Sequence, residues 1–394
     1  MNEHILHTEV QEYIHKHLNT DVASILFKGV PFDGVSAKEV VLQIESKKKC
    51  EKKLPTWSRT EGIYFPKKLS IEQTSSETTA RYKAKLVSGK SLVDITGGLG
   101  VDTFFYSKNV EKVMHCEIDE ELSKIAAHNY QALGANNIDT HAGDGIRYLE
   151  ASTGPLDWIY ADPSRRNDAK GKVFLLKDCL PDVVEHLDLF FERSKNILIK
   201  TAPLLDITQG LRDLKHVKEV HCVAVGNEMK ELLWVLEHDY QEEPVIIAMN
   251  LQNEGEQRFE GSRTAEAEAI VQYSAPKKYL YEPNAAILKA GFFKSLCRAY
   301  EVTKLHQHSH LYTSDQLVDF PGKRFLIEDH MPFNKKKLKR KLKGLHSSIA
   351  TRNFGVSAAQ LKKELHIKES STHQLFFTTD ESAKGIVLLC HRIT

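Results

Sequence analysis

The sequence lacks the features that mark several classes of protein. Its six cysteines lie far apart and include no C-x-x-C pair, which argues against a disulfide framework or a zinc site and for free thiols in a reducing compartment. No apolar run approaches the roughly 20 residues that span a bilayer. The amino-terminal residues have no apolar centre of a secretory signal. We therefore expect a cytoplasmic protein that neither crosses a membrane nor holds a metal.

Acidic residues are missing from one stretch near the carboxyl terminus. Between Met331 and Lys363 there is no Asp or Glu, whereas ten Lys and Arg residues fall there. Because the whole chain has a formal net charge of +1, the remainder carries about −9. Such a polarised chain has a local surface suited to a polyanionic partner, although its total charge is close to zero.

Apolar periodicity divides these 394 residues into several domains. Helical spacing and the capping-box pair Ser36 and Glu39 predict helices at the start. From Ser91, short Val-, Ile- and Leu-rich runs alternate with helical segments at 101–108, 119–133, 178–194 and 206–214, which predicts an α/β fold with a parallel sheet covered on both faces. Two strands joined by a short turn close this part as an antiparallel pair. We expect a helical region with a lid at 1–85, a Rossmann-like domain at 86–245, an α+β region at 246–322 and a basic α+β module at 323–394.

A glycine-rich turn follows the first strand of the Rossmann-like domain. It runs from Asp94 to Asp102, and such turns let backbone approach a ligand while the N–H groups of the next helix face it. Glu117 ends the second strand, where an acid can accept the hydroxyls of a ribose, and Asp144 follows the third, where it could meet an adenine amino group. The candidate cofactor-binding residues are Asp94, Thr96, Gly97, Gly98, Gly100, Asp102, Glu117, Ile118, Asp144 and Gly145.

This succession resembles the class I S-adenosylmethionine-dependent methyltransferases over roughly residues 75–240. The first motif of that family has an acid and then three alternating glycines; here Thr96 occupies the first glycine position, and Gly98 and Gly100 keep the other two. The resemblance implies a seven-stranded sheet whose last strand is antiparallel, with S-adenosylmethionine as cofactor. An NAD-binding domain is the rival interpretation. Glu117, the Gly143-Asp144 loop and the motif after the fourth strand argue against it.

That motif is Asp162-Pro163-Ser164-Arg165-Arg166, and it is similar to the Asp/Asn-Pro-Pro-aromatic signature of amino-group methyltransferases. The Asp162 carboxylate and the Pro163 carbonyl can accept both N–H bonds of an exocyclic amine, which directs the nitrogen lone pair toward the methyl group. Arg165 replaces the aromatic residue, and a guanidinium can stack on a base or hold a phosphate. We expect Asp162, Pro163, Arg165 and Lys200 to be catalytic.

Lys200 ends the fifth predicted strand and should point into the same cleft. With Asp162 it matches two members of the Lys-Asp-Lys-Glu set of ribose 2′-O-methyltransferases. Glu228 and either Lys83 or Lys85 could supply the other two. Methylation of a ribose hydroxyl therefore stays open beside methylation of a base nitrogen.

Two further segments have competing interpretations. The hydroxyls of residues 73–77 could hold the methionine carboxylate of the cofactor under a lid, or they could simply cap the following helix. His306, His308 and His310 alternate and would share one face of a strand, but no carboxylate or cysteine lies nearby in sequence. We expect no metal there.

The carboxyl-terminal module contains a basic amphipathic helix. Leu338, Leu342 and Leu345 lie on one helical face, and seven cations occupy the nine positions from Lys335 to Lys343. This pattern predicts a nucleic-acid partner, RNA more than DNA. The β-α-β-α-β-β order and the stretch IATRNFGVSAAQLKKEL resemble the THUMP-like module at the end of some bacterial methyltransferases. The candidate RNA-binding residues are Arg166, Lys335, Lys336, Lys337, Lys339, Arg340, Lys341 and Lys343.

Together these features predict an S-adenosylmethionine-dependent methyltransferase that acts on structured RNA, either tRNA or rRNA, at a base nitrogen. The alternatives are a ribose 2′-O-methyltransferase, a methyltransferase acting on protein or a small molecule, and a non-catalytic RNA-binding adaptor. Intact Gly98, Gly100, Glu117 and Asp162 argue against the adaptor.

Overall fold

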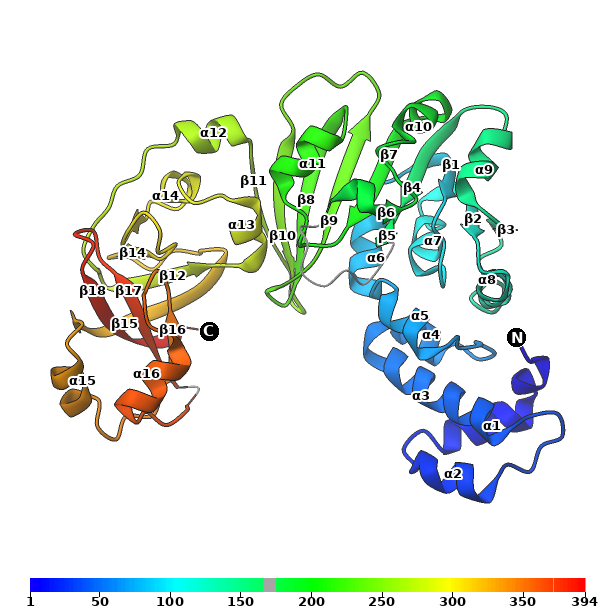
Figure 1. Ribbon diagram of the computed structural model, residues 1–394, viewed down its shortest axis with the longest axis horizontal. Helices are drawn as coiled ribbons and strands as arrows, with labels where there is room; N and C mark the ends of the chain where they lie inside the picture. The colour runs from blue at the N-terminus through cyan, green and yellow to red at the C-terminus, as the bar shows by residue number, and fades with distance from the viewer. Residues whose placement is uncertain (166–174, 371, 394) are drawn as a thin grey trace. The chain divides into compact units, whose positions relative to one another are not determined.

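The computed structural model describes residues 1–165, 175–370 and 372–393 (Figure 1). Its contacts divide the chain into two compact units. The first comprises Met1–Glu219 with Leu232–Glu242, and the second comprises Val220–Glu231 with Glu243–Thr394. Among the described residues, no helix is both long and apolar enough to cross a membrane. Arg166, a predicted RNA contact, lies outside the described residues.

Short helices build the start of the first unit. They are η1 (Glu3–Leu6), α1 (Thr8–Lys16), α2 (Val22–Lys28), α3 (Ala37–Lys53), α4 (Pro55–Arg59), α5 (Lys68–Gln73) and α6 (Glu77–Ala84). The predicted capping box at Ser36 and Glu39 is present at the start of α3. The Asn129 side chain ties this helical region to the sheet domain, because it accepts from the Tyr64 amide at 2.9 Å and donates to the Tyr64 carbonyl at 3.0 Å.

A mostly parallel sheet forms the core of the first unit. Its strands are β1 (Gly89–Asp94), β2 (Val110–Glu117), β3 (Ile138–Ala142), β4 (Leu156–Ala161), β7 (Ser194–Thr201) and, from Leu232 onward, β9 (Glu228–Glu237), whereas most of β8 (Val217–Val225) is assigned to the second unit. Hydrogen bonding follows the order β3-β2-β1-β4-β7-β9-β8 and then reaches β10 (Val245–Leu251) and β11 (Glu256–Gly261). Strand β9 is antiparallel to β7, whereas β1, β2, β3, β4 and β7 pair in parallel. The predicted Rossmann-like sheet with an antiparallel closing strand is therefore confirmed, with two more strands in its order.

The strand order reverses between β1 and β4. The connections through α7 (Val101–Tyr106) and α8 (Glu120–Ala132) lead from β1 to β3, whereas those through α9 (Gly145–Ala151) and α10 (Leu187–Arg193) lead from β3 to β7. Right-handed crossovers in opposite directions place their helices on opposite faces of the sheet. The reversal leaves a crevice at the carboxyl ends of β1 and β4, which is where such sheets bind ligands.

One helix prediction differs from the structure in this unit, and one helix was not predicted. The segment 178–194 is not one helix: η2 (Leu176–Asp178) and β6 (Cys179–Leu180) come first, and α10 begins only at Leu187. Pro181 explains the break, because proline removes an amide donor and disfavours helix at the residue before it. Helix α9 was not predicted. The helix α11 (Ile207–Asp213) lies within the predicted 206–214.

A seven-stranded sheet organises the second unit. The strands β12 (Tyr279–Pro283), β13 (Thr303–Lys304), β14 (Tyr312–Ser314), β15 (Gly322–Pro332), β16 (Ser348–Thr351), β17 (His373–Thr379) and β18 (Gly385–Ile393) follow the order β13-β14-β12-β15-β18-β17-β16. The predicted β-α-β-α-β-β order is present from β15 onward, with α15 (Lys335–Lys341) and α16 (Ala358–Leu365) as its helices. Strand β12 hydrogen-bonds directly to β15.

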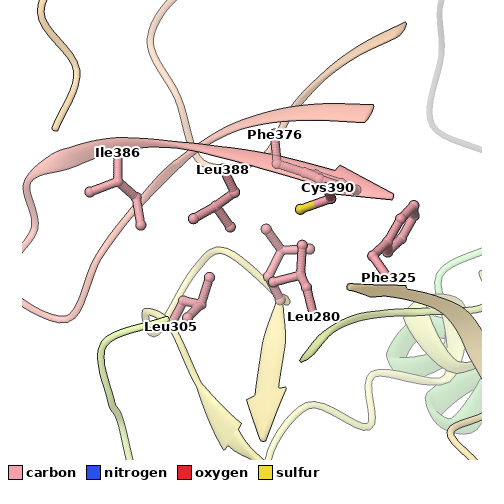
Figure 2. Packing of buried hydrophobic residues seen from close by; sticks show 8 residues of the cluster. Leu280, Leu305, Phe325, Phe376, Ile386, Leu388 and Cys390 are labelled. Atoms are coloured by element: carbon pink, nitrogen blue, oxygen red, sulfur yellow. The ribbon is translucent and has the colours of Figure 1, made fainter. Parts of the chain in front are cut away.

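Alternating apolar side chains fill both faces of this second sheet. Figure 2 shows one face, where Leu280, Leu305, Phe325, Phe376, Ile386, Leu388 and Cys390 pack together. On the other face Leu375, Phe377 and Val387 pack against Leu338 and Leu342 of the basic segment and against α16. The apolar side of the predicted basic helix is therefore buried as expected. The remaining helices of this unit are α12 (Arg263–Glu268), α13 (Ala285–Ala290) and α14 (Ser295–Ala299), the last two separated at Gly291, which has a φ of +83°.

Candidate cofactor and substrate site

A cavity of about 990 Å³ lies at the carboxyl ends of the parallel strands in the first unit. Most of the predicted site residues line it, although they come from separate loops. These are Asp94, Thr96, Gly97, Gly98, Asp102, Glu117, Ile118, Asp144, Gly145, Asp162 and Lys200. Gly100 and Pro163 are not among the lining residues, and the Arg165 side chain lies outside the described part of the structure.

The glycine-rich turn is held against the end of β2. The Gly97 amide donates to the Cys116 carbonyl at 2.8 Å, and the Gly98 amide donates to Glu117 Oε2 at 2.7 Å. Gly100 precedes α7 with a φ of +82°, and a Cβ there would lie 1.9 Å from Tyr130 Oη. Only glycine fits such a position without strain. Gly100 therefore shapes the turn, whereas Gly97 and Gly98 line the cavity.

Three residues at the strand ends fit the nucleoside half of S-adenosylmethionine. Glu117 is fixed by the amides of Gly98 and Asp119, the latter at 2.8 Å, and each carboxylate oxygen keeps a lone pair for a ribose hydroxyl. Ile118 lines the cavity with a side chain that is 74% exposed, which offers an apolar surface to a flat ring. Asp144 caps α9 through the Ile146 amide at 2.8 Å.

A buried ionic network supports the other half of the cavity. Lys83 has no exposed surface, and its Nζ lies 3.1 Å from Asp102 Oδ1 and 2.9 Å from Ser75 Oγ. The hydroxyls of Ser75 and Tyr160 donate to Asp102 Oδ2 at 2.8 and 2.9 Å. Ser75 also lines the cavity with Gln73 and Thr74, while Ser76 caps α6 by accepting from the Thr79 amide at 3.2 Å. Segment 73–77 therefore both lines the cavity and caps a helix.

Asp162 and Lys200 meet at the edge of the cavity. Lys200 Nζ forms an ion pair with Asp162 Oδ2, and both side chains are partly exposed. Thr96 Oγ1 accepts from the Asp162 amide at 2.7 Å. The threonine that replaces the first glycine of the family motif therefore links the cofactor turn to the loop that carries Asp162. Sequence reasoning gave no signal for this link.

The proposed Lys-Asp-Lys-Glu set is only half assembled in the described residues. Asp162 and Lys200 are together, but Lys83 is engaged with Asp102 and Ser75 instead. Glu228 forms an ion pair with Lys230 at 2.9 Å. The buried carboxylate of Asp102 holds the ammonium group of Lys83, so of the two lysines considered for the set, Lys85 stays a prediction.

Asp94 is completely buried beneath the turn. Burial raises the pKa of its carboxyl to about 7. Hydrogen bonds from the Thr103 hydroxyl at 2.6 Å and the Thr96 amide at 3.0 Å favour the charged form and lower the pKa, but burial has the larger effect. The neighbouring carboxylates of Asp102 and Asp162 raise this pKa further. Asp94 thus anchors Thr96 and α7 and becomes costly to the fold when it ionises.

We expect Asp94→Asn to stabilise the protein progressively as the pH rises. The wild-type carboxyl has a pKa of about 7 when folded and about 3.8 when unfolded. Its contribution to stability is therefore complete below pH 3.8 and is lost as the pH rises to about 7. Relative to wild type, the variant should gain about 3 kcal/mol between pH 5 and pH 8. Denaturant unfolding at both pH values measures the free energy of unfolding, and Asp188→Asn, a change at an exposed carboxylate, is the control. If the variant and wild type differed in this free energy by the same amount at both pH values, Asp94 would not have a raised pKa.

The histidine series does not form a shared strand face. His306, His308 and His310 lie between β13 and β14. The rings of His306 and His308 are 5.7 Å apart, whereas His310 stacks on Phe293 with a centroid distance of 3.8 Å. Burial lowers the pKa of His310 to about 4.

The predicted RNA-binding cations lie on an exposed helix surface of the second unit. Lys335 forms an ion pair with Glu364 at 2.7 Å, and Lys341 pairs with Asp329. No acidic partner is seen among the described residues for the other five, which are Lys336, Lys337, Lys339, Arg340 and Lys343. A cluster of exposed cations without ion-pair partners in the described structure remains, and Glu364, the partner of Lys335, also lies near Lys339.

Known proteins similar to this chain agree with these features. Residues 279–321 match a family described as a ferredoxin-like domain, and residues 322–392 match one described as THUMP domain-like. The crystal structure of a protein assigned as a methyltransferase from Porphyromonas gingivalis W83 is 32% identical, with a TM-score of 0.90, and the match covers 99% of this chain and 98% of that one.

An uncharacterized S-adenosylmethionine-dependent methyltransferase of Mycobacterium tuberculosis is 20% identical over 307 residues, covering 76% of this chain and 80% of that protein. The residues that line the cavity fit this cofactor, because they include an acid at a strand end, an exposed apolar side chain and a glycine-rich turn. Since a relative with 32% identity matches nearly the whole chain, the protein belongs to the family of S-adenosylmethionine-dependent methyltransferases that end in a THUMP-like domain.

Proposed function

We propose that this enzyme methylates a base nitrogen in a structured RNA, such as a tRNA or rRNA. The observation that carries the proposal is the position of Asp162, on a loop that lines the cofactor cavity and is held by Thr96. Glu117, Ile118 and Asp144 hold the nucleoside of S-adenosylmethionine, and the glycine turn borders its methionine part. The cofactor supplies an activated methyl group, so the chain itself must position the acceptor.

Asp162 orients the acceptor nitrogen. Among the described residues, Lys200 contacts Oδ2 of Asp162, and Oδ1 accepts one N–H of an exocyclic amine. The Pro163 carbonyl, which follows Asp162 on the same loop although Pro163 is not among the lining residues, accepts the second N–H, so that the nitrogen lone pair points along the line of transfer. Arg165 and Arg166 steady the nucleotide by stacking or by holding its phosphate.

Ribose 2′-O-methylation is a second candidate because of one contact. The ion pair with Asp162 holds the Lys200 ammonium group at the edge of the cavity, and in this second proposal that group lowers the pKa of a ribose hydroxyl. Both candidates use the same cavity and the same RNA. The two candidate reactions differ in whether methyl transfer requires a negatively charged side chain at position 162.

The cations around α15 support RNA as the substrate class. Five exposed basic side chains without acidic partners in the described structure can contact phosphates, and the THUMP-like match at residues 322–392 supports the same partner. Lys335 and Lys341 are tied to acidic neighbours and contribute less.

Transfer of radiolabelled methyl groups to total RNA, with protein and DNA fractions assayed in parallel, tests the substrate class. We expect label in a tRNA or rRNA band. Replacing Lys336, Lys337, Lys339 and Arg340 together with glutamine should raise KM for that RNA about 10- to 100-fold at low salt, with little change in kcat, because up to four phosphate contacts are lost. The matched control replaces exposed Lys368 and Lys384. Label in protein instead of RNA would refute the proposal.

A further inference from the structure

Three potential metal ligands converge on neighbouring strands of the second sheet. They are Glu328 on β15, His373 on β17 and His391 on β18. Strand β18 lies between the other two, and His373 and His391 are direct cross-strand partners. Paired residues of an antiparallel ladder point to the same face, so both imidazoles lie on one side of the sheet.

A β-bulge brings the carboxylate to the same place. Ile327 pairs with Cys390 and Asp329 pairs with the next residue, Leu389, so Glu328 is the extra residue of β15. Bulges redirect a side chain out of the regular alternation. Here Glu328 reaches across β18, and its Oε2 lies 3.5 Å from His373 Nε2.

The three side chains are arranged almost as the ligands of a bound metal ion are. Their ligand atoms all lie within 4.8 Å of one another, and the two imidazole rings are 6.0 Å apart at an interplanar angle of 71°. Zinc holds imidazole nitrogen and carboxylate oxygen at about 2.0–2.2 Å, so its ligand atoms are about 3–4 Å apart. Side-chain shifts of about 1 Å would close the set.

The surroundings favour an ion with an open coordination position. Glu328 and His391 are exposed and His373 is partly exposed, so water can complete the coordination. Buried Ser347 fixes the backbone beside one ligand, because its Oγ donates to the His373 carbonyl at 2.9 Å. Two imidazoles with one carboxylate suit a divalent transition ion better than magnesium or calcium, which prefer oxygen ligands.

We propose that Glu328, His373 and His391 bind a divalent transition-metal ion, with zinc as the reference ion. The ion joins β15, β18 and β17 on one face of the THUMP-like domain and is separate from the methyl-transfer cavity. Its ligands come from three distant segments of the chain, which is why no local spacing in the sequence indicated it.

Calorimetric titration of the EDTA-treated full-length protein with zinc chloride tests the site. We expect one ion per chain with a dissociation constant in the micromolar range or below, and a zinc-dependent rise in melting temperature. His391→Ala should weaken binding at least about tenfold and remove the rise in melting temperature. Glu328→Gln provides a second variant, with circular dichroism as the check on folding.

His330→Ala is the matched control, since His330 is an exposed histidine on β15 that pairs opposite Leu388, two positions beyond the bulged residue. This control should bind zinc as wild type does. Unchanged zinc binding in both His391→Ala and Glu328→Gln would overturn the proposal. It would also be overturned if wild type bound no zinc below 100 µM, a concentration about a hundredfold above the largest dissociation constant that we expect.

Discussion

Asp162→Ala is expected to reduce methyl transfer by about a thousandfold or more while leaving the affinity for S-adenosylmethionine within about twofold of wild type. In the proposed mechanism Asp162 holds the acceptor, and residues that line the cavity at the ends of β1, β2 and β3 hold the cofactor. The loss should therefore appear in kcat and not in cofactor binding. Single-turnover methyl transfer and calorimetry with the cofactor measure the two quantities. Full activity in this variant would disprove the catalytic assignment.

Asp162→Asn separates the two proposed acceptors. If the acceptor is an amine, the asparagine carbonyl can still accept an N–H, and we expect at least about a tenth of the wild-type rate, since a neutral acceptor makes a weaker hydrogen bond than a charged one. If the acceptor is a ribose hydroxyl, the ion pair with Lys200 disappears and the rate should fall as far as in the alanine variant. Asp182→Asn, which changes another carboxylate lining the cavity, is the control and should keep wild-type activity.

The largest expected effect on stability comes from Lys83→Met. Lys83 is wholly buried, and the change leaves the carboxylate of Asp102 without its cation. Breaking a buried ion pair by removing one partner costs about 3–5 kcal/mol, whereas removing both partners costs much less. We therefore expect the free energy of unfolding of the first unit to fall by about 3–5 kcal/mol, which denaturant unfolding measures. The double variant Lys83→Met/Asp102→Leu should recover part of the loss.

A neighbouring lysine provides the control for this prediction. Lys85→Met changes an exposed side chain at the end of the same helix and should alter stability by less than about 0.5 kcal/mol. Because Ser75 and Asp102 also line the cavity, Lys83→Met should weaken cofactor binding in the protein that remains folded. A loss of less than about 1 kcal/mol would contradict a stabilising ion pair between Lys83 and Asp102.

The sequence was most informative where structure depends on local pattern. Alternating apolar runs predicted the parallel strands, the short connection before Glu228 predicted an antiparallel closing pair, and the capping pair at Ser36 marked the start of a helix. Helix α9 was missed because it begins with Gly145, a weak helix former. That glycine is required by packing, since a Cβ there would lie 2.5 Å from the Ile95 carbonyl oxygen.

The contacts between distant segments could not be predicted. Lys83 was considered as a partner of Asp162, but burial beside Asp102 decided its pairing. The link between Thr96 and Asp162 depends on how two strand ends meet, as does the approach of Glu328 to His373. Residue types and spacing identify what a side chain can do, and only the assembled sheet determines which partner it meets.

The pairing of β12 with β15 bears on how this protein can have evolved. The two sequence families that match the second unit meet between residues 321 and 322, yet strands from either side of that border are hydrogen-bonded neighbours from Tyr279–Leu326 to Pro283–Gly322. Separating the two segments would expose an unpaired strand edge on each, and such edges promote aggregation. The ferredoxin-like and THUMP-like segments are therefore expected to be inherited, lost or exchanged together, as a single module.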